Sequence, residues 1–331
     1  MSAKYSRIIS TGSALPAARI TNEDLARRLA ADGIETSDEW IRTRTGIEAR
    51  RFVNGTTETT TTLAAAAAQK ALEGGGVDPK TIDLIIVATT TPDQVFPSTA
   101  AAVQRLIGAV GCAAFDVQAV CAGFIYALNA ADAMLRAGPY QRALVIGAET
   151  MSRVIDMKDR ATCVLFGDGA GAVVLEASAK PGILAARMYA DGSYDENVLG
   201  LTARIDHGEL CGRPYINMDG RQVFKLAVDG LTSSAQEVAV LAGVDPQDVD
   251  VYIPHQANLR IMTMVAKKLG IPDERMIKTV SEQGNTSAAS VPLALDEAVR
   301  SGKISDGSLV LLQAVGAGMA WGSAIVRWRG E

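Results

Sequence analysis

The sequence predicts an α/β protein made of two similar halves. Helix-forming segments alternate with short, apolar, β-branched segments along the chain, which is typical of strand–helix–strand units. Two stretches also recur at nearly the same spacing. Residues 76–86 resemble residues 243–253 at an offset of 167, and residues 143–146 resemble residues 308–311 at an offset of 165. Both offsets are close to half of the 331 residues, which favours a duplication over chance.

The elements of the first half follow from local patterns. Residues 64–72 are good helix formers and stop at the glycines 74–76, a helix end. Residues 82–88 form a β-branched run that suits a strand buried on both faces. A short strand is predicted over 115–120, and residues 171–175 are predicted to be the closing strand of this half.

The second half repeats this order. Helices are predicted over 231–241 and 259–269, and strands over 249–253, 309–312 and 322–328. We expect mainly parallel sheets and a division into residues 1–178 and 179–331. Residues 189–218 lie between the halves and lack periodicity, so they are predicted to be a long excursion of the kind that carries function.

Composition excludes several classes of protein. The chain is 48% hydrophobic and 21% charged, which excludes intrinsic disorder. Its net charge of -5 argues against a general nucleic-acid binder. Four cysteines are too few for a disulfide framework, and neither a signal peptide nor an apolar run of about 18 residues is evident. We expect a cytoplasmic protein that binds neither nucleic acid nor membrane.

Cys121 has the most informative context of the four cysteines. It follows the strand 115–120 and begins a predicted helix over 121–137, which ends at a Gly-Pro pair. The partial positive charge and free N–H groups of a helix start stabilise a thiolate, so we expect a lowered pKa and a nucleophile. A buried structural cysteine is the alternative.

His255 and Asn285 are the other candidates for chemistry. His255 follows the strand 249–253, at the carboxyl end where ligands gather in α/β proteins, and a proton-transferring histidine or a structural one would fit there. Asn285 lies in a run of small polar residues, as a fixed uncharged donor or as a turn residue. The only other histidine, His207, lies in a polar loop, and no metal-ligand spacing is present.

Two glycine-rich stretches have different interpretations. Residues 167–171 resemble a dinucleotide-binding loop, but a strand rather than a helix follows them, so we reject that interpretation. Residues 315–322 follow the strand 309–312, and a tight turn there could aim a backbone N–H at a reacting oxygen.

Taken together, these segments resemble the β-ketoacyl-acyl-carrier-protein synthase III family of thiolase-fold condensing enzymes. The resemblance covers essentially the whole chain, and it rests on several long motifs in the family's order. They occupy residues 36–47, 121–124, 166–172, 254–258 and 284–290. The resemblance implies a thiolase-like fold, with the two duplicated halves packed as a layered α-β-α-β-α body.

The resemblance also implies a catalytic triad of Cys121, His255 and Asn285. An acyl-CoA, with acetyl-CoA as the expected primer, would load its acyl group onto Cys121. A malonyl thioester on acyl carrier protein would then lose CO₂, and the resulting enolate would attack the acyl group. The backbone N–H groups of Cys121 and Ala317 would form the oxyanion hole. No cofactor is implied, because acyl-CoA is a substrate.

Binding roles are carried over position by position. The resemblance assigns the CoA-binding positions to Trp40, Arg44, Arg160 and Arg221. It assigns the positions that bind the carrier protein to Lys225, Gln256, Arg260, Lys267 and Lys268. Phe96 matches the residue that reaches into the acyl pocket of a partner subunit, so a homodimer is implied, and Val315 borders the same pocket. A solvated helix face is the alternative for the basic positions.

Three departures from the family pattern bear on the substrate. The family usually has Phe-Gly-Gly-Gly where this chain has Val315, Gly316, Ala317 and Gly318. Ala317 can present its N–H only if its φ is negative or the strain is tolerated. Val315 is smaller than the usual phenylalanine, and Arg221 replaces a common asparagine.

Three other functions compete with the initiation of fatty-acid synthesis. A polyketide or quinolone enzyme would use the same triad with another acyl-CoA. A papain-like protease also has Cys, His and Asn in this order, but the Cys-Gly-Ser-Cys-Trp signature is missing. A carrier-binding module without activity would leave Cys121 without a purpose.

Overall fold

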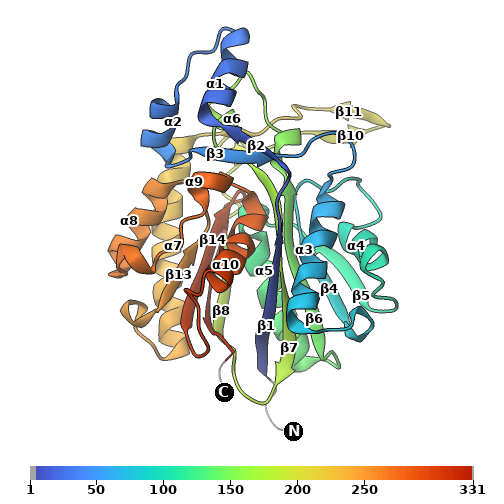
Figure 1. Cartoon of the computed structure of the whole chain (residues 1–331). Coiled ribbons are helices and arrows are strands. Elements are labelled where there is room, and N and C mark those ends of the chain that lie inside the picture. Colours follow the sequence, from blue (N-terminus) through green and yellow to red (C-terminus); the bar gives the residue numbers. More distant parts are fainter. Residues whose placement is uncertain (1–4, 330–331) are drawn as a thin grey trace.

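The computed structural model describes residues 5–329 as five stacked layers, with two β-sheets separated and flanked by helices (Figure 1). Helices α3 (Thr60–Gly75) and α4 (Thr99–Ile107) cover the outer face of the first sheet. Helices α5 (Gly123–Ala137) and α10 (Ser290–Arg300) lie between the two sheets. Helices α7 (Gly220–Ala242) and α8 (Leu259–Leu269) cover the outer face of the second sheet. The predicted layered fold is confirmed.

The first sheet has five strands in the order β1-β7-β6-β4-β5. These are β1 (Tyr5–Ala14), β4 (Leu84–Ala88), β5 (Ala113–Val117), β6 (Arg142–Thr150) and β7 (Asp168–Ser178). Strand β4 runs parallel to β5 and β6, whereas β7 runs antiparallel to both β1 and β6.

The second sheet has four strands in the order β13-β14-β15-β8. These are β8 (Ile183–Ala190), β13 (Val251–Pro254), β14 (Leu309–Gly316) and β15 (Ala320–Arg327). Only β13 and β14 pair in parallel. The expectation of mainly parallel sheets is therefore wrong, because a three-residue turn joins β14 to β15, and strands joined by so short a turn must run antiparallel.

The two halves repeat one another element by element. The 3₁₀ turns Pro79–Thr81 and Val120–Ala122 recur 167 residues later as Pro246–Asp248 and Ser287–Ala289. Helix α5 follows the turn Val120–Ala122, and helix α10 follows the turn Ser287–Ala289, so the two helices also begin 167 residues apart. Strands of the first sheet all lie before residue 179 and those of the second after residue 182.

The middle layer is apolar on nearly all sides because it touches both sheets. Phe124, Ile125 and Leu128 of α5 are completely buried, as are Val291 and Ala294 of α10. These residues form one hydrophobic cluster with side chains from strands of both sheets. The sequence of α5 is accordingly poor in charge.

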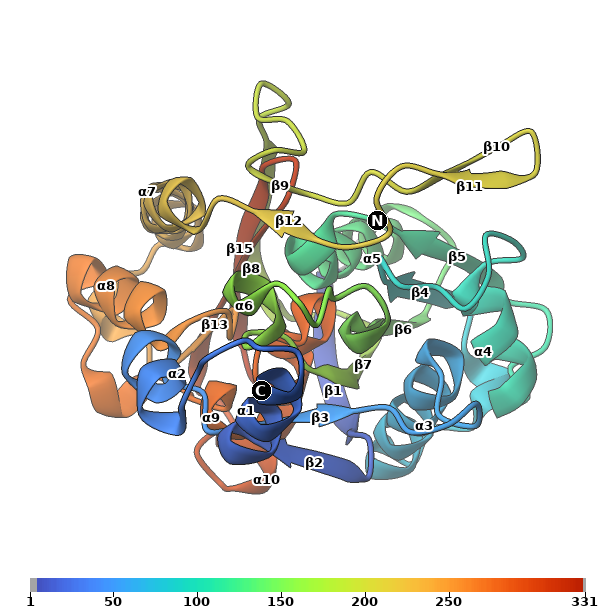
Figure 2. The ribbon, with the colours of Figure 1, turned by 90° about the horizontal axis from the view of Figure 1, so that it is seen from above.

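Shorter elements gather at one end of the layers (Figures 1 and 2). The residues between β1 and α3 form β2 (Ala18–Thr21), α1 (Asn22–Ala31), α2 (Asp38–Thr45) and β3 (Ala49–Phe52). The predicted excursion contains β9 (Leu199–Gly200), β10 (Arg204–Asp206), β11 (Glu209–Cys211) and β12 (Asn217–Met218). Two short helices complete this end, α6 (Arg160–Cys163) and α9 (Val280–Gln283).

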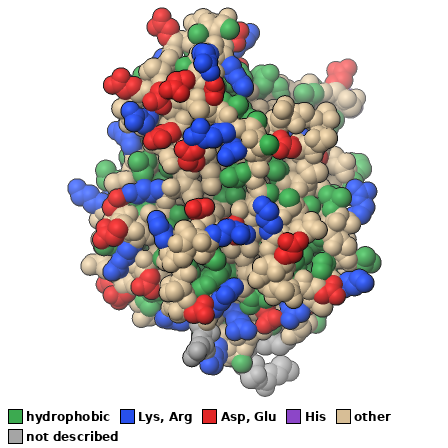
Figure 3. Space-filling view, viewed as in Figure 1, with side chains coloured by type: hydrophobic (Ala, Val, Ile, Leu, Met, Phe, Trp, Pro, Cys, Tyr) green, Lys and Arg blue, Asp and Glu red, His purple; other side chains and the backbone are tan. Residues whose placement is uncertain are grey.

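Acidic and basic side chains are interspersed on the face shown in Figure 3, and no field of a single sign dominates it. Among residues 5–329, no helix combines the length and the apolar character that a membrane crossing requires.

Candidate active site

Cys121 lies in the turn between β5 and α5, as the sequence predicts. The turn is sharp, because Val120 has a φ of 47°, in the left-handed region that a β-branched residue rarely adopts. Such strain persists where the surrounding structure requires a particular geometry, and here it places the cysteine directly before α5. The side chain of Cys121 is only 5% exposed.

The expectation of a lowered pKa at Cys121 is wrong for this structure. Burial raises the pKa of the Cys121 thiol to about 12, and the nearby carboxyl group of Glu149 acts in the same direction. The side chain of Ser287 acts in the opposite direction and lowers the pKa of the thiol. The thiol is therefore protonated at neutral pH, and its proton must leave when it attacks a substrate.

His255 lies directly after β13, and its backbone N–H donates to the carbonyl of Gln313 at 2.8 Å. Burial lowers the pKa of His255 to about 3, so the ring is neutral at physiological pH. Nδ1 lies 2.5 Å from Oγ of Ser290, which also accepts the N–H of Gln256 at 3.4 Å. Among the described residues, Nδ1 is the one acceptor for the Ser290 hydroxyl. The hydroxyl therefore donates to Nδ1, and Nε2 carries the ring proton.

Asn285 is fixed by both its backbone and its side chain. Its N–H donates to the carbonyl of Leu165 at 2.8 Å, and its own carbonyl accepts from Gly167 at 2.9 Å. Its Oδ1 accepts the backbone N–H of Ser287 at 2.9 Å. Because the oxygen is used in this way, the Nδ2 amide is the group of Asn285 that remains to donate to a ligand.

Cys121, His255 and Asn285 line one cavity of about 1090 Å³. Val315 and Ala317 line it too, as do residues of the excursion such as Leu199 and Met218. Both halves therefore line the cavity, with Cys121 from the first half and His255 and Asn285 from the second. Its volume suits a substrate larger than a simple acyl group.

The turn after β14 approaches Cys121 closely. A Cβ on Gly316 would lie 2.7 Å from the backbone nitrogen of Cys121 and 3.0 Å from the carbonyl oxygen of Ala119, so only glycine fits there. In the turn, Gly318 takes the positive φ of 116°, and Ala317 has no positive φ. Ala317 can therefore present its N–H without the strain of a positive φ.

The other glycine-rich stretch is structural. Residues 168–171 begin strand β7, as the rejection of a dinucleotide-binding loop requires. A Cβ on Gly171 would lie 2.6 Å from the backbone of Pro292 and Leu293, so glycine allows α10 to pack against the strand. His207, the other histidine, lies on an exposed hairpin away from the cavity.

Three of the predicted CoA-binding residues form one cluster. The guanidinium groups of Arg44 and Arg160 each lie 4.5 Å from the ring centroid of Trp40. The carbonyl of Arg44 also accepts from Nδ2 of Asn258, a residue of the cavity wall, at 3.2 Å. The cluster therefore lies beside the cavity. Arg221 is exposed at the start of α7, beside the lining residue Gly220.

The predicted carrier-binding residues are exposed, with one exception. Lys225, Arg260 and Lys267 are exposed, and so is Lys268, which pairs with Asp229 at 3.2 Å. Gln256 is only 1% exposed. Its amide group donates to the carbonyls of Pro254 and Ile277, and it accepts the N–H groups of Thr279 and Val280. The assignment of Gln256 to the carrier surface is therefore wrong, because a buried and fully bonded side chain holds loops together.

Sequence reasoning missed three residues of this site, namely Glu149, Ser287 and Ser290. The two serines belong to a run of small polar residues that resembles any turn. Glu149 carried a signal that could have been used, because it is an acidic residue at the end of an otherwise apolar strand.

Comparison with known proteins identifies the class. The model of 3-oxoacyl-acyl-carrier-protein (ACP) synthase III matches residues 115–192, and the model of its C-terminal part matches residues 240–328. The synthase III from Aquifex aeolicus VF5 is 48% identical, with a TM-score of 0.90 over 98% of this chain and 100% of that one. The chain therefore belongs to the 3-oxoacyl-ACP synthase III family.

Two further structures show how wide the similarity is. The synthase III from Pseudomonas aeruginosa PAO1 is 38% identical, with a TM-score of 0.90 over 98% of each chain. The priming β-ketosynthase of the R1128 polyketide pathway is 37% identical, with a TM-score of 0.92 over 98% of this chain and 96% of that one.

Proposed function

We propose that the protein catalyses a decarboxylative Claisen condensation between an acyl-CoA primer, with acetyl-CoA expected, and malonyl-acyl carrier protein. The product is a 3-oxoacyl-acyl carrier protein, the first intermediate of fatty-acid synthesis. One observation carries the proposal: a thiol, a neutral imidazole and a carboxamide line the same cavity. Family membership and the similarity to synthases of two bacteria support it.

In the first step, Sγ of Cys121 attacks the thioester carbonyl of the acyl-CoA, and the CoA thiolate leaves. The negative charge of the tetrahedral intermediate is stabilised by the N–H groups of Cys121 and Ala317. The close approach of Gly316 to the backbone of Cys121 supports this role, since it brings the end of β14 to the turn that contains Cys121.

In the second step, a malonyl thioester loses CO₂ and an enolate forms. The enolate needs hydrogen-bond donors, and His255 and Asn285 can supply them without carrying a charge. The low pKa of His255 keeps the ring neutral, so Nε2–H would donate to the developing oxygen charge, and the amide of Asn285 would be the second donor. The carbanion then attacks the acyl group on Cys121, and the thiolate is released.

The substrates would approach from the end of the layers where the short elements gather. The Trp40, Arg44 and Arg160 cluster offers a flat ring and two cations to an adenine and its phosphates. One guanidinium group would move aside for a base that stacks on the ring. The exposed Lys225, Arg260 and Lys267 offer positive charge to an acidic carrier protein. The reaction needs no cofactor, and we place it in the cytoplasm, where CoA and carrier thioesters are used.

We also propose a homodimer. Strand β5 is the edge of the first sheet, and the segments directly before α4 and directly before β5 carry exposed apolar side chains. Phe96, Val95 and Val110 are 82%, 75% and 85% exposed. Such a patch favours a partner, and Phe96 is then free to enter its cavity. Light scattering should report a dimer for the wild type and a smaller species for Phe96→Asp. A monomeric wild type would contradict the dimer.

A second candidate function is the priming step of a specialised pathway. It is favoured by the similarity to the R1128 priming β-ketosynthase and by the small Val315 beside the triad. A panel of acyl-CoA primers with malonyl-acyl carrier protein distinguishes the two. Efficient turnover of acetyl-CoA supports the first function. Turnover of only longer or branched primers supports the second.

A further inference from the structure

Glu149 is a buried carboxylate that the mechanism above does not use. It lies near the end of β6 and is completely buried. No ion pair joins it to a cation within residues 5–329. It accepts hydrogen bonds from the backbone and hydroxyl of Thr90 and from the hydroxyls of Thr89, Thr91 and Ser287. Burial raises the pKa of its carboxyl group, so it holds a proton more readily than an exposed glutamate.

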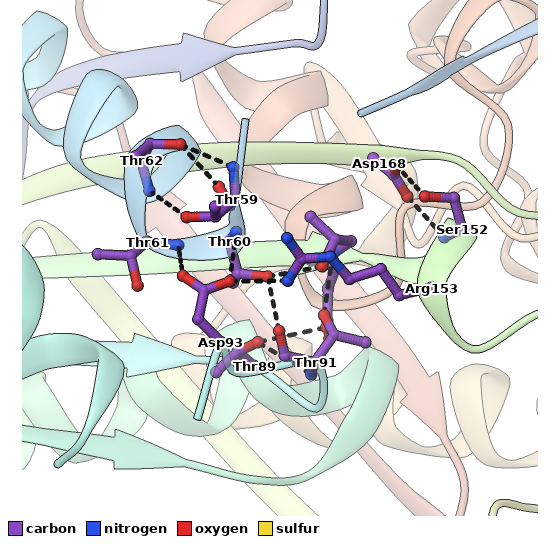
Figure 4. A network of polar contacts seen from close by, with 12 residues as sticks. Thr59, Thr60, Thr61, Thr62, Thr89, Thr91, Asp93, Ser152, Arg153 and Asp168 are labelled. Atoms are coloured by element: carbon purple, nitrogen blue, oxygen red, sulfur yellow. Dashed lines mark hydrogen bonds and ion pairs between the residues drawn. The ribbon is translucent and has the colours of Figure 1, made fainter. Parts of the chain in front are cut away.

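A network of threonines fixes the loop that surrounds this carboxylate (Figure 4). The hydroxyl of Thr60 donates to the carbonyl of Thr91 at 2.6 Å and lies 2.8 Å from the hydroxyl of Thr150. The backbone N–H of Thr150 in turn donates to Oγ1 of Thr91 at 2.9 Å. The hydroxyl of Thr91, which donates to Glu149, is therefore held in place by contacts with Thr60 and Thr150.

Ser287 connects Glu149 to the nucleophile. Its hydroxyl donates to Oε1 of Glu149 at 3.0 Å, and its side chain lies close enough to the thiol of Cys121 to lower the pKa of that group. Ser287 is completely buried, and its φ is 49°, which is rare for a residue with a side chain. It occupies the position 167 residues after Val120, whose φ of 47° places Cys121. The two strained turns pack against each other, so the thiol of Cys121 and the hydroxyl of Ser287 come from neighbouring turns.

We propose that Ser287 and Glu149 form a proton relay that takes the proton of Cys121 during acylation and returns it after condensation. The proposal rests on the proposed function, because it describes how the nucleophile of that reaction is activated. In this relay Ser287 would exchange the proton with the reacting sulfur, and Glu149 would act through Ser287.

The proton transfers balance. As Sγ of Cys121 bonds to the acyl carbon, its proton passes to Oγ of Ser287, and the hydroxyl proton of Ser287 passes to Oε1 of Glu149. The thioester bond to CoA breaks, and the CoA thiolate takes a proton from solvent. In the condensation the bond between Sγ and the acyl carbon breaks. The cysteine thiolate then regains its proton from Glu149 by the reverse path.

Electrostatics favour this direction. A charged Glu149 opposes a thiolate at Cys121, and this repulsion contributes to the raised pKa of the thiol. If the proton moves to Glu149 as the thiol attacks, Glu149 becomes neutral while negative charge develops at the reacting sulfur and carbonyl. Two adjacent anions are therefore never present together. The start of α5 then stabilises the thiolate that forms. The high pKa of the resting thiol and its role as nucleophile are thereby compatible.

The test is the single-turnover rate of acyl transfer to Cys121 at saturating acetyl-CoA, followed by quenching and intact-protein mass. Ser287→Ala removes the hydroxyl and keeps the backbone N–H that holds Asn285. We expect it to slow acylation by about 100-fold, in the range of general acid–base effects, with little change in the half-saturating acetyl-CoA concentration.

Glu149→Gln tests the terminal acceptor by the sign of its effect. A relay predicts slower acylation, because the acceptor is gone. If Glu149 merely repels the thiolate, the same substitution should speed acylation. Ser6→Ala is the matched control, because Ser6 is another buried serine that donates to a buried carboxylate, Asp132, at 2.7 Å. It should leave the rate unchanged, and thermal melts should show that all variants are folded.

Two outcomes would overturn the relay. One is a folded Ser287→Ala variant that acylates at the wild-type rate, and the other is a Glu149→Gln variant that acylates at the wild-type rate or faster. Either result would leave the proposed function intact. If the wild type itself gains no acyl group on Cys121, the proposed function fails first, so the two failures are distinguishable.

Discussion

His255 is buried, and its pKa falls to about 3, whereas an unperturbed histidine titrates near pH 6.5. The cause is desolvation, since charging a buried ring without a carboxylate beside it is unfavourable. The ring is therefore a neutral donor over the whole physiological range. Burial of this neutral ring lowers the free energy of unfolding in acid, because the unfolded chain gains a proton there that the folded chain does not accept.

This difference predicts how stability depends on pH. The contribution of His255 is complete above pH 6.5 and is lost as the pH falls from 6.5 towards 3. We expect the unfolding free energy of the wild type to fall relative to that of His255→Gln by up to about 1.4 kcal/mol per pH unit between pH 6 and 4. Urea unfolding of both proteins across this range measures the difference.

The control for this experiment is His207→Gln, because the side chain of His207 is 98% exposed. It should follow the wild type at every pH. Parallel pH curves for the wild type and His255→Gln would contradict the neutral, buried state of His255.

The limits of sequence reasoning are clearest at single residues. Cys121, His255 and Asn285 could be singled out because each has a chemistry that a strand end or helix start makes useful. Ser287 and Ser290 could not, since their importance comes from contacts with residues more than 30 positions away. The pKa of Cys121 was predicted with the wrong sign, because the helix start is visible in a sequence and the depth of burial is not.

At the scale of elements, the close approach of β14 to the turn before α5 builds the site. The approach depends on Gly316, since a Cβ there would press on the backbone of Cys121 and Ala119. The backbone cannot yield easily, because β14 pairs with β13 on one side and β15 on the other.

We therefore expect Gly316→Ala to lower the unfolding free energy by about 1–3 kcal/mol, the usual cost of overpacking, and to reduce acylation of Cys121. Chemical denaturation and intact mass measure the two effects. Gly74→Ala is the control, because this exposed glycine lies in α3 and its nearest neighbour to a new Cβ is 3.6 Å away. The control should be neutral or slightly stabilising. Equal effects of the two substitutions would contradict the role of Gly316.

Helices and strands were predicted best where the pattern was long. The predicted helix 259–269 has the bounds of α8, and the predicted strand 82–88 contains β4. The direction of strand pairing was predicted less well, since β1 and β8 pair with strands distant in sequence. Within the two main sheets, only the three-residue turn between β14 and β15 indicates an antiparallel pairing from the sequence.

At the scale of the whole molecule, the two halves share the layer formed by α5 and α10. Each helix contacts strands of both sheets, and their buried residues form one cluster. A half on its own would expose this apolar layer to water. The duplication thus produces one body with one cavity, in which the thiol comes from one half and the imidazole and carboxamide from the other.

This arrangement predicts a single cooperative unfolding transition. Far-UV circular dichroism reports the helices of all layers. The fluorescence of the three tryptophans reports helix α2, which contains Trp40, and the second half, which contains Trp321 and Trp328. The two signals should change at the same urea concentration. Separate midpoints would show that the halves unfold independently, contrary to the shared layer.

The central claim is that the cavity between the halves carries an acyl group on Cys121 and passes it to a malonyl thioester. Intact-protein mass after incubation with acetyl-CoA tests this directly. We predict one added acetyl group on the wild type, none on Cys121→Ser, and loss of the group when malonyl-acyl carrier protein is added. A wild type that gains no acetyl group, or one whose label persists in Cys121→Ser, would contradict the account.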